Sequence, residues 1–343
     1  MKVVKTEHAV GMVLGHDITE IVPGEFKGVA FKKGHVIKET DIERLLRIGK
    51  EHIYIFELNE NELHEDEAAL QLGSYICGKG IHFTNPPHEG KINIEPDYRG
   101  LLKINRDILD EVNDLGDICI ATIHGNRTIN EGELIGGCRV IPLKIDKSKI
   151  EEVEKIVAEK GKIFEVKPFN KLRAALIVTG SEVAKGRIED KFGPVVEKKL
   201  LNFGSEVFYK TIVPDDLDTI KETVLKCKEM GAELIVVTGG MSVDPDDKTP
   251  GAIKETGADI VSYGTPVLPG AMLLFAYLDG IPVFGLPGCV MFSATTAFDL
   301  LLPRVIAGET IVRKDITRMG YGGQCLKCEV CTFPNCHFGK NCL

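Results

Sequence analysis

From residue 172 onward, short apolar runs alternate with amphipathic segments, and this alternation restricts the fold more than any other feature of the chain. The runs at residues 174–178 and 234–237 are continuously apolar, which is typical of parallel strands that are covered on both faces. Asp279-Gly280 between two apolar runs predicts one hairpin. We therefore expect an α/β fold in the C-terminal half, with a doubly wound, mostly parallel sheet over residues 172–308.

Turn and capping signals predict where several helices begin and end. Asp215 and Asp216 are interpreted as caps of the helix that follows Pro214. Residues 148–151 have the form of a capping box, and Gly161 is the expected end of that helix. One long helix is predicted after Gly288, ending near residue 308.

The 343 residues are enough for two or three domains. Smaller mixed or β-rich N-terminal domains are expected before the α/β domain. Residues 1–79 are interpreted as a small α+β region, 80–165 as a mixed or β-rich domain, 167–170 as a linker and 317–343 as a Cys-rich metal-binding tail.

Composition narrows the class of protein. The chain is 43% apolar and 27% charged, and its net charge is −9 without a long basic run. Nucleic acid is therefore not expected as a partner, because phosphate backbones need clustered Lys and Arg. No apolar stretch reaches the ~18 residues of a membrane span, and no signal-peptide core follows the first residues. A cytoplasmic location is expected.

The most distinctive segment is residues 236–250, where an apolar run ends in Gly239 and Gly240. Glycines there let the backbone turn sharply and let a ligand approach closely. Asp244, Asp246 and Asp247 follow, and carboxylates so placed suit Mg²⁺ shared with substrate phosphates. The alternative is that these residues only cap the next helix. We predict them as catalytic residues, with Asp247 and Asp244 as Mg²⁺ ligands.

Three loops follow strand ends, at residues 179–182, 238–247 and 285–293, and parallel topology brings such loops to one edge. Backbone N–H groups at helix N-termini can then bind an anion without basic side chains. Glu182 and Asp190 are candidates for contact with a hydroxyl or a base edge. The candidate ligand-binding residues are Thr179, Gly180, Ser181, Glu182, Asp190, Thr238, Gly239, Gly240, Met241, Ser242, Thr249, Pro287, Gly288 and Ser293.

Five of the ten cysteines lie in the last 19 residues. The spacing Cys325-x2-Cys328-x2-Cys331-x4-Cys336 begins like an iron–sulfur run, and four thiolates also suit a tetrahedral Zn²⁺ site. Spacing leaves both metals open, and a flexible redox tail is the alternative. The five isolated cysteines are interpreted as small buried hydrophobes.

Five elements of the α/β domain resemble the molybdopterin-binding domain family. Molybdopterin molybdotransferases, molybdopterin adenylyltransferases and the competence-damage-type nicotinamide-nucleotide amidases share this domain. The elements that carry the resemblance are Thr179-Gly180-Ser181-Glu182, Val213-Pro214-Asp215-Asp216, Thr238-Gly239-Gly240-Met241-Ser242, Asp247-Lys248-Thr249-Pro250 and Gly285-Leu286-Pro287-Gly288.

The resemblance implies roles for particular residues. The pterin phosphate or nucleotide would lie in a cradle built by Ser181, Gly239, Gly240, Ser242 and Gly288. The Mg²⁺-linked carboxylate would be that of Asp247, supported by Asp244 or Asp246. Mg²⁺ would polarise the phosphoanhydride of adenylylated molybdopterin while molybdate enters the dithiolene.

The chain departs from the molybdotransferase pattern in three places. Asp244 stands where that family usually has glycine, and residues 288–293 replace a shorter Gly-Asn-Pro-x-Ser. The first 165 residues lack the family's Asp-Gly-Tyr-Ala element.

The expected function is therefore molybdopterin binding in molybdenum cofactor biosynthesis, with Mg²⁺-dependent molybdate insertion as the first hypothesis. The alternatives are a nucleotide hydrolase or amidase of the competence-damage branch, and a non-catalytic molybdopterin carrier or sensor. The expected partners are a pterin nucleotide, molybdoenzymes or other cofactor-biosynthesis proteins, and further copies of the chain in a homo-oligomer.

Overall fold

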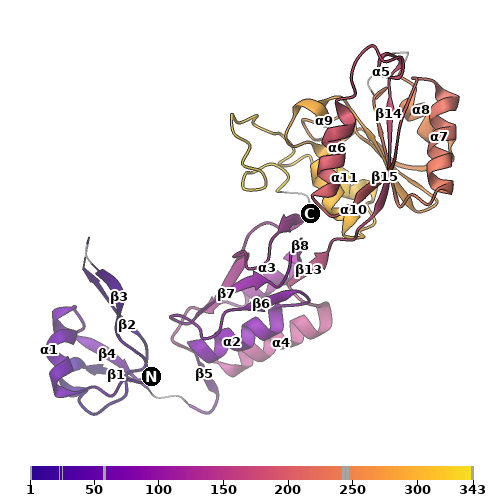
Figure 1. Cartoon of the computed structure of the whole chain (residues 1–343). Coiled ribbons are helices and arrows are strands. Elements are labelled where there is room, and N and C mark those ends of the chain that lie inside the picture. The colour runs from indigo at the N-terminus through magenta and orange to yellow at the C-terminus, as the bar shows by residue number, and fades with distance from the viewer. Residues whose placement is uncertain are drawn as a thin grey trace. The chain divides into compact units, whose positions relative to one another are not determined.

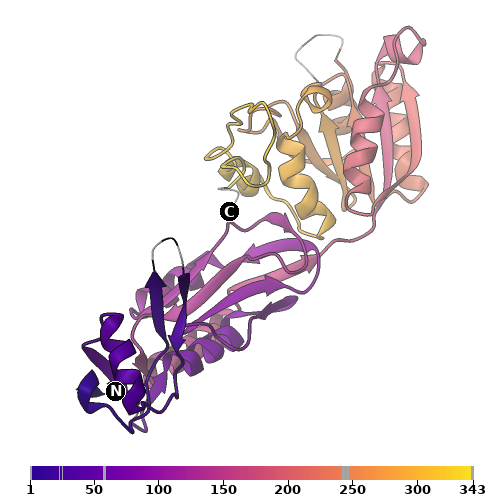
Figure 2. The ribbon, with the colours of Figure 1, turned by 60° about the vertical axis from the view of Figure 1, so that its left-hand side comes forward.

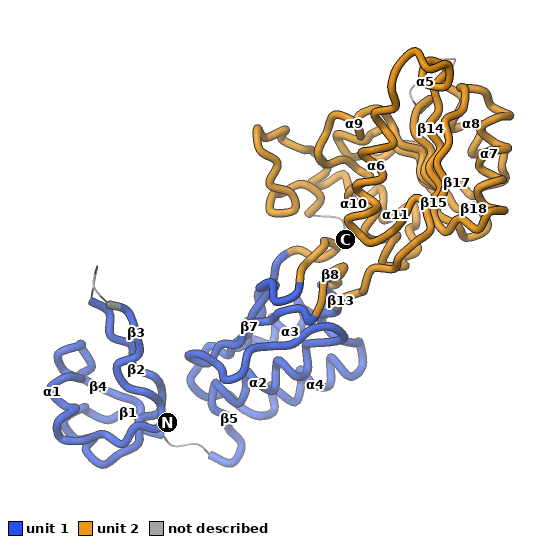
Figure 3. Tube along the Cα trace, in the orientation of Figure 1, with its two compact units in different colours: residues 1–97, 104–123, 131–165 blue, residues 98–103, 124–130, 166–343 orange. Residues whose placement is uncertain are grey.

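The computed structural model describes residues 2–22, 24, 26–56, 59–241, 244 and 247–340. Figure 1 labels its helices and strands, and Figure 2 gives a second view of the same ribbon. The chain forms two compact units (Figure 3). Unit 1 contains residues 1–97, 104–123 and 131–165, and unit 2 contains residues 98–103, 124–130 and 166–343.

The N-terminal part of unit 1 has its own small apolar core, which includes Leu14, Leu45 and Ile53. Two antiparallel strand pairs, β1 with β4 and β2 with β3, and one helix surround it. The elements are β1 (Lys2–Lys5), η1 (Thr6–His8), β2 (Ile18–Val22), β3 (Phe26–Phe31), α1 (Glu39–Arg47) and β4 (His52–Ile55).

The rest of unit 1 is an antiparallel sheet in the order β6-β7-β11-β9, accompanied by three helices. Gly73 lets α2 pack closely on this sheet, since a Cβ there would lie 2.6 Å from Cδ1 of Ile92. The structure thus groups α2 with the sheet, whereas the sequence analysis placed residues 59–79 in the N-terminal region. The elements are β5 (Glu62–His64), α2 (Glu65–Ile76), β6 (Ile81–Phe83), β7 (Lys91–Pro96), α3 (Arg106–Asp114), β9 (Ile118–Thr122), β11 (Gly136–Val140), β12 (Lys144–Asp146) and α4 (Lys147–Lys160).

The start of α4 corrects one prediction. The helix begins at Lys147, and Ser148 lies inside its first turn rather than at a capping box. Gly161 ends the helix as predicted, with φ +102° and its N–H donating to the carbonyl of Val157 at 2.9 Å.

A three-stranded sheet in the order β10-β8-β13 precedes the α/β domain. Its strands are β8 (Gly100–Ile104), β10 (Arg127–Ile129) and β13 (Phe164–Pro168). Because β13 continues to Pro168, the first half of the predicted linker at residues 167–170 is strand.

The α/β domain of unit 2 contains a six-stranded sheet in the order β15-β14-β16-β19-β18-β17. The first four strands are parallel, and β18 and β17 are antiparallel to their neighbours. The strands are β14 (Arg173–Thr179), β15 (Glu206–Val213), β16 (Leu234–Thr238), β17 (Asp259–Tyr263), β18 (Leu274–Leu278) and β19 (Ile281–Leu286).

Alternate side chains of β14 enter two different cores. Leu176 and Val178 join the core shared with α6 and α10, while Ala175 and Ile177 join the core shared with α7 and α8. Helices therefore cover both faces of the sheet, as Figure 1 shows, and the predicted doubly wound fold is confirmed. The helices are α5 (Ser181–Ala184), α6 (Phe192–Leu201), α7 (Leu217–Glu229), α8 (Thr249–Glu255), α9 (Cys289–Phe292), α10 (Ala297–Ile306) and α11 (Arg313–Arg318).

The hairpin prediction is confirmed, and the long-helix prediction is wrong. Asp279 and Gly280 have φ +48° and +84°, as a two-residue I′ turn between β18 and β19 requires. Two helices, α9 and α10, replace the single helix expected after Gly288. Thr296 restarts the helix, because its hydroxyl accepts the N–H of Phe298 at 3.3 Å and Asp299 accepts the N–H of Thr296 at 2.7 Å.

In the part of the chain that the structure describes, no helix combines the length and the apolar character that crossing a membrane requires.

Candidate functional site

The carboxyl ends of four parallel strands meet at one edge of the large sheet. Residue pairs Thr179↔Val213, Val178↔Thr238 and Thr238↔Leu286 place the ends of β14, β15, β16 and β19 side by side. The three loops predicted from the sequence therefore share this edge, and the loop after β15 joins them. Ligands of open α/β sheets bind in this position.

The backbone of Gly239 and Gly240 forms a tight cradle at this edge. Their φ angles are +90° and +56°, and a Cβ on Gly239 would lie 2.3 Å from the carbonyl oxygen of Thr179. A Cβ on Gly240 would lie 2.5 Å from Oδ1 of Asp215. Buried Thr249 holds this conformation, since its hydroxyl donates to the Gly239 carbonyl at 2.9 Å and its N–H donates to the Gly240 carbonyl at 3.3 Å. The cradle therefore has space for glycine only.

Asp215 faces the cradle, and the prediction that it caps a helix is wrong. Asp216 is the N-cap of α7, as predicted, and accepts the N–H of Thr219 at 2.9 Å. Oδ1 of Asp215 is buried and has no hydrogen-bond partner among the described residues. Burial and then the nearby carboxylate of Asp247 raise the pKa of Asp215, and Glu182 adds to this, although a hydrogen bond from the backbone of Lys248 and the charge of Lys248 oppose the shift. A cation bound beside this carboxyl would favour its charged form.

The sequence alone could indicate that Asp215 belongs to the site, but only once the order of the strands is known. Only one of two adjacent aspartates can occupy the N-cap position of α7. Once β15 is known to lie beside β14, the first aspartate after β15 falls at the same edge as the glycine loop.

Asp247 and Asp244 lie in the turn that leads into α8. The N–H of Asp247 donates to the Asp244 carbonyl at 3.0 Å. Ser242 and Asp246, which are also predicted site residues, lie outside the described residues. No group of three or more His, Cys, Asp or Glu side chains is arranged to hold a metal ion within the described ranges. A Mg²⁺ ion at this edge would therefore rely on one or two carboxylates and on ligand phosphates.

The first loop presents polar groups to the same edge. Gly180, with φ +146°, precedes the short helix α5. Ser181 is half-buried and Glu182 is exposed. Thr238 at the end of β16 is fully buried, and its hydroxyl has no partner among the described residues.

Two predicted ligand-binding residues, Met241 and Asp190, make contacts inside the domain that explain their positions without a ligand. Met241 is 3% exposed and packs in a core, where its sulfur would lie 2.8 Å from a Cβ on Gly285. Oδ1 of Asp190 accepts the N–H of Gly193 at 2.9 Å at the start of α6, and Oδ2 pairs with Lys210 at 2.9 Å.

The third loop separates into two environments. Pro287 is buried and Gly288 is exposed directly after β19. Ser293 follows α9 and lines a cavity of 540 Å³ whose wall also contains four cysteines of the C-terminal segment. The residues between Gly288 and Ser293 thus form one turn of helix rather than a part of the cradle.

Fold and site together define a doubly wound α/β domain with a glycine cradle and acidic residues at the carboxyl edge of its sheet. Residues 175–307 match a family model described as a probable molybdopterin binding domain. This part of the chain is therefore a domain of the molybdopterin-binding type. A second family model, described as a domain of unknown function, matches residues 3–57.

Curated relatives match part of the chain. A CinA-like protein of Mycobacterium tuberculosis is 38% identical over 77 residues, which are 22% of this chain and 18% of the relative. A molybdopterin molybdenumtransferase of Staphylococcus aureus is 33% identical over 132 residues, which are 36% of this chain and 31% of the relative. The match thus spans less than a third of either relative's length.

Solved structures also resemble this domain. The tungsten cofactor synthesizing protein MoaB from Pyrococcus furiosus is 26% identical, with a TM-score of 0.34, over 39% of this chain and 92% of its own. The protein CinA from Thermoplasma acidophilum is 23% identical, with a TM-score of 0.31, over 35% of this chain and 89% of its own.

Proposed function

We propose that the α/β domain binds the phosphate or nucleotide part of a molybdopterin, and that the protein acts in molybdenum cofactor biosynthesis. The observation that carries the proposal is the cradle of Gly239 and Gly240. The hydroxyl of Thr249 holds the Gly239 carbonyl, and Asp215 lies beside Gly240. Backbone N–H groups beside a glycine turn bind phosphate oxygens without basic side chains, which suits a chain of net charge −9. The match of residues 175–307 to the molybdopterin-binding family model supports the same ligand.

The finer proposal is Mg²⁺-dependent insertion of molybdate into adenylylated molybdopterin. The residues at the cradle suit the ion, because Asp215 has a buried oxygen without a partner among the described residues and lies near Asp247. These two carboxylates would hold Mg²⁺ together with ligand phosphates. Bound there, Mg²⁺ would neutralise charge on the phosphoanhydride.

The chain's own residues would bind and orient the ligand. Thr249 fixes the Gly239 carbonyl, because its hydroxyl donates to that oxygen at 2.9 Å. Backbone N–H groups at this glycine turn would then bind the phosphate. Glu182 is exposed at the same edge and near Asp215, where its carboxylate would accept a ligand hydroxyl. Ser181 would donate to the phosphate from the start of α5.

A nucleotide hydrolase is the second candidate, because the CinA-like relatives match 77 residues at 38% identity. It would use the same cradle and the same two carboxylates, but its turnover would not depend on molybdate.

The decisive experiment incubates the full chain with adenylylated molybdopterin, Mg²⁺ and molybdate and measures AMP release. We expect release that requires both Mg²⁺ and molybdate, and we expect Asp215→Asn and Asp247→Asn to abolish it. Asp216→Asn is the matched control: it is one residue away, and asparagine caps a helix as well as aspartate does.

The other outcomes separate the alternatives. Tight pterin binding without AMP release would identify a carrier, and molybdate-independent nucleotide turnover would identify a hydrolase. Absence of pterin binding, or equal loss of release in all three variants, would refute the proposed site.

A further inference from the structure

The C-terminal segment is folded onto the α/β domain and is not a loose tail. Phe338 is 2% exposed and belongs to the core that contains α10. Gly339, with φ +74°, lies so close to α10 that a Cβ would be 2.4 Å from Cδ2 of Leu300, and its N–H donates to the Gly322 carbonyl at 3.0 Å. Figure 2 shows this yellow segment beside the gold helices of the domain.

A second anchor holds the beginning of the segment. The N–H of Leu268 donates to the Gly323 carbonyl, and the N–H of Cys325 donates to the Leu268 carbonyl, both at 2.8 Å. Residues 323–339 therefore form a loop with both ends attached to the domain, and the cysteines lie within it.

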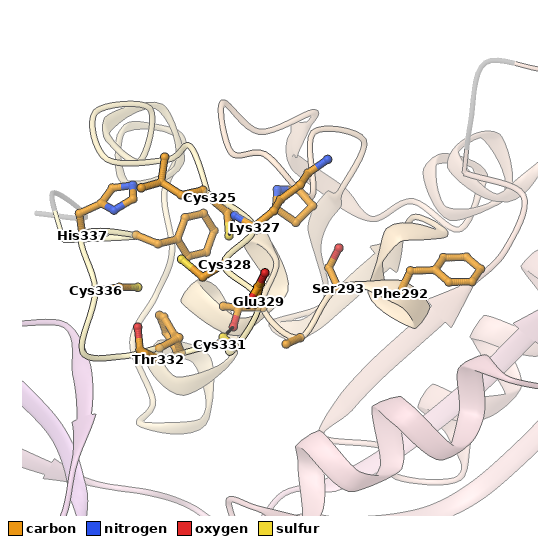
Figure 4. Close-up of a pocket in the computed structure, with 16 residues that line it drawn as sticks. Phe292, Ser293, Cys325, Lys327, Cys328, Glu329, Cys331, Thr332, Cys336 and His337 are labelled. Carbon is orange, nitrogen blue, oxygen red and sulfur yellow. Dashed lines mark hydrogen bonds between the residues drawn. The ribbon is translucent and has the colours of Figure 1, made fainter.

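Four cysteines of this loop line one cavity of 540 Å³ (Figure 4). Cys325 and Cys336 are partly buried, and Cys328 and Cys331 are exposed. All four are free thiols in the described structure. Sequence spacing alone cannot bring the fourth cysteine to the first three; the attached loop does.

Hydrogen bonds reach two of the sulfur atoms. Lys327 has φ +54°, an uncommon angle for a residue with a side chain, and its N–H donates to the sulfur of Cys325 at 3.4 Å. The hydroxyl of Thr295 lies 3.5 Å from the sulfur of Cys331. Hydrogen bonds to sulfur stabilise the thiolate form that binds metal, and they tune iron–sulfur clusters.

The contacts to sulfur and the cysteine spacing point to a cluster rather than a single zinc ion. Four thiolates around one Zn²⁺ lie about 2.3 Å from it and hence close to one another. All four cysteines line the same cavity. A cluster holds its thiolates further apart, and the Cys-x2-Cys-x2-Cys spacing resembles the start of an iron–sulfur run. His337 also lines the cavity, but its Nε2 lies 2.7 Å from the Gln324 carbonyl, which occupies that nitrogen.

We propose that Cys325, Cys328, Cys331 and Cys336 bind an iron–sulfur cluster in this cavity. The site is separate from the proposed pterin site. Helix α9 (Cys289–Phe292) links the two, because it follows Gly288 of the third loop and is followed by Ser293 on the cavity wall. The longer third loop of this chain therefore builds one wall of the cluster site.

The test uses the full chain, purified without oxygen and reconstituted with ferrous iron and sulfide. Iron, acid-labile sulfide and zinc are measured, together with the visible absorption and the electron paramagnetic resonance of the reduced protein. We expect iron and sulfide in equal amounts and a broad visible band. Tightly bound zinc without iron, or no retained metal, would overturn the proposal.

Variants then locate the cluster. Cys328→Ser and Cys331→Ser change exposed side chains, so the fold should persist, as circular dichroism would check, while most of the iron is lost. Cys119 was expected to be buried, but it is exposed on β9. Cys119→Ser is therefore the matched control and should retain the iron, as should His337→Ala. Full iron retention in both cavity variants, or equal loss in Cys119→Ser, would contradict the assignment.

Discussion

Replacement of Gly240 by alanine tests the cradle most directly. At φ +56° an alanine pays about 1–2 kcal/mol for the left-handed backbone conformation. Its methyl group would also lie 2.5 Å from Oδ1 of Asp215 and 2.8 Å from Oγ1 of Thr249. Thr249 cannot move freely, because its hydroxyl bonds the Gly239 carbonyl at 2.9 Å. Such crowding adds about 1–3 kcal/mol, so we expect a total loss of roughly 2–5 kcal/mol in the free energy of unfolding.

Gly257 provides a matched control in the same domain. It follows α8 with φ +86°, and a Cβ there would meet no described atom within 4 Å. Gly257→Ala therefore carries only the conformational cost of about 1–2 kcal/mol. The difference between the two variants isolates the steric contribution of Asp215 and Thr249.

Urea unfolding followed by circular dichroism measures this difference, since the chain has no Trp for a fluorescence signal. Binding of the pterin nucleotide to each variant is measured in parallel. Gly240→Ala should unfold at lower urea than Gly257→Ala and should lose binding that Gly257→Ala retains. Equal unfolding midpoints with equal binding would show that the space at Gly240 has no role, and the cradle argument would be refuted.

Two further predictions concern pH. Burial alone would raise the pKa of Glu309, but hydrogen bonds from Lys103 and Arg304 outweigh it and lower the pKa to about 2; the stability that Glu309 contributes is then present above pH 4.5 and is lost as the pH falls toward 2. Glu309→Gln should lower the free energy of unfolding at pH 7 by about 2–3 kcal/mol, after allowance for screening. The unfolding midpoint of this variant should fall less steeply below pH 4.5 than that of the wild type, and an unchanged slope there would contradict the prediction. Burial, with help from Asp66, raises the pKa of Glu65 to about 6, so its ionisation costs stability as the pH rises from 4.5 through 6. Glu65→Gln should therefore raise the unfolding free energy at pH 7 by about 1–2 kcal/mol and leave it unchanged near pH 4, and a lower midpoint at pH 7 would show that the carboxylate is needed.

The sequence was sufficient for features that depend on local pattern. The continuous apolar run at residues 234–237 predicted a strand buried on both faces, and β16 is fully buried. Asp279-Gly280 predicted a turn that depends on two positive φ angles, and the hairpin is present. The apolar pattern predicted one continuous helix, whereas a new helix begins after Thr296. A capping residue acts through its own hydrogen bonds, which the apolar periodicity does not report.

The sequence did not predict the direction in which individual side chains at the site point. Met241 sits between two site residues in the chain, yet its side chain packs in a core under the sheet edge. Asp215 and Asp216 are chemically identical neighbours, and only their backbone positions separate a helix cap from a residue that faces the cradle.

By itself, the sequence determined the α/β class of the C-terminal half, the glycine turn after β16 and the cysteine spacing of the last segment. These properties follow from periodicity and turn chemistry, which act over a few residues. Only the tertiary structure decided that Asp215 meets Gly240 and that Cys336 shares a cavity with Cys325. The physical reason is that parallel strand pairing and an attached loop bring together groups that are distant in the chain, and local sequence carries no record of which strands become neighbours.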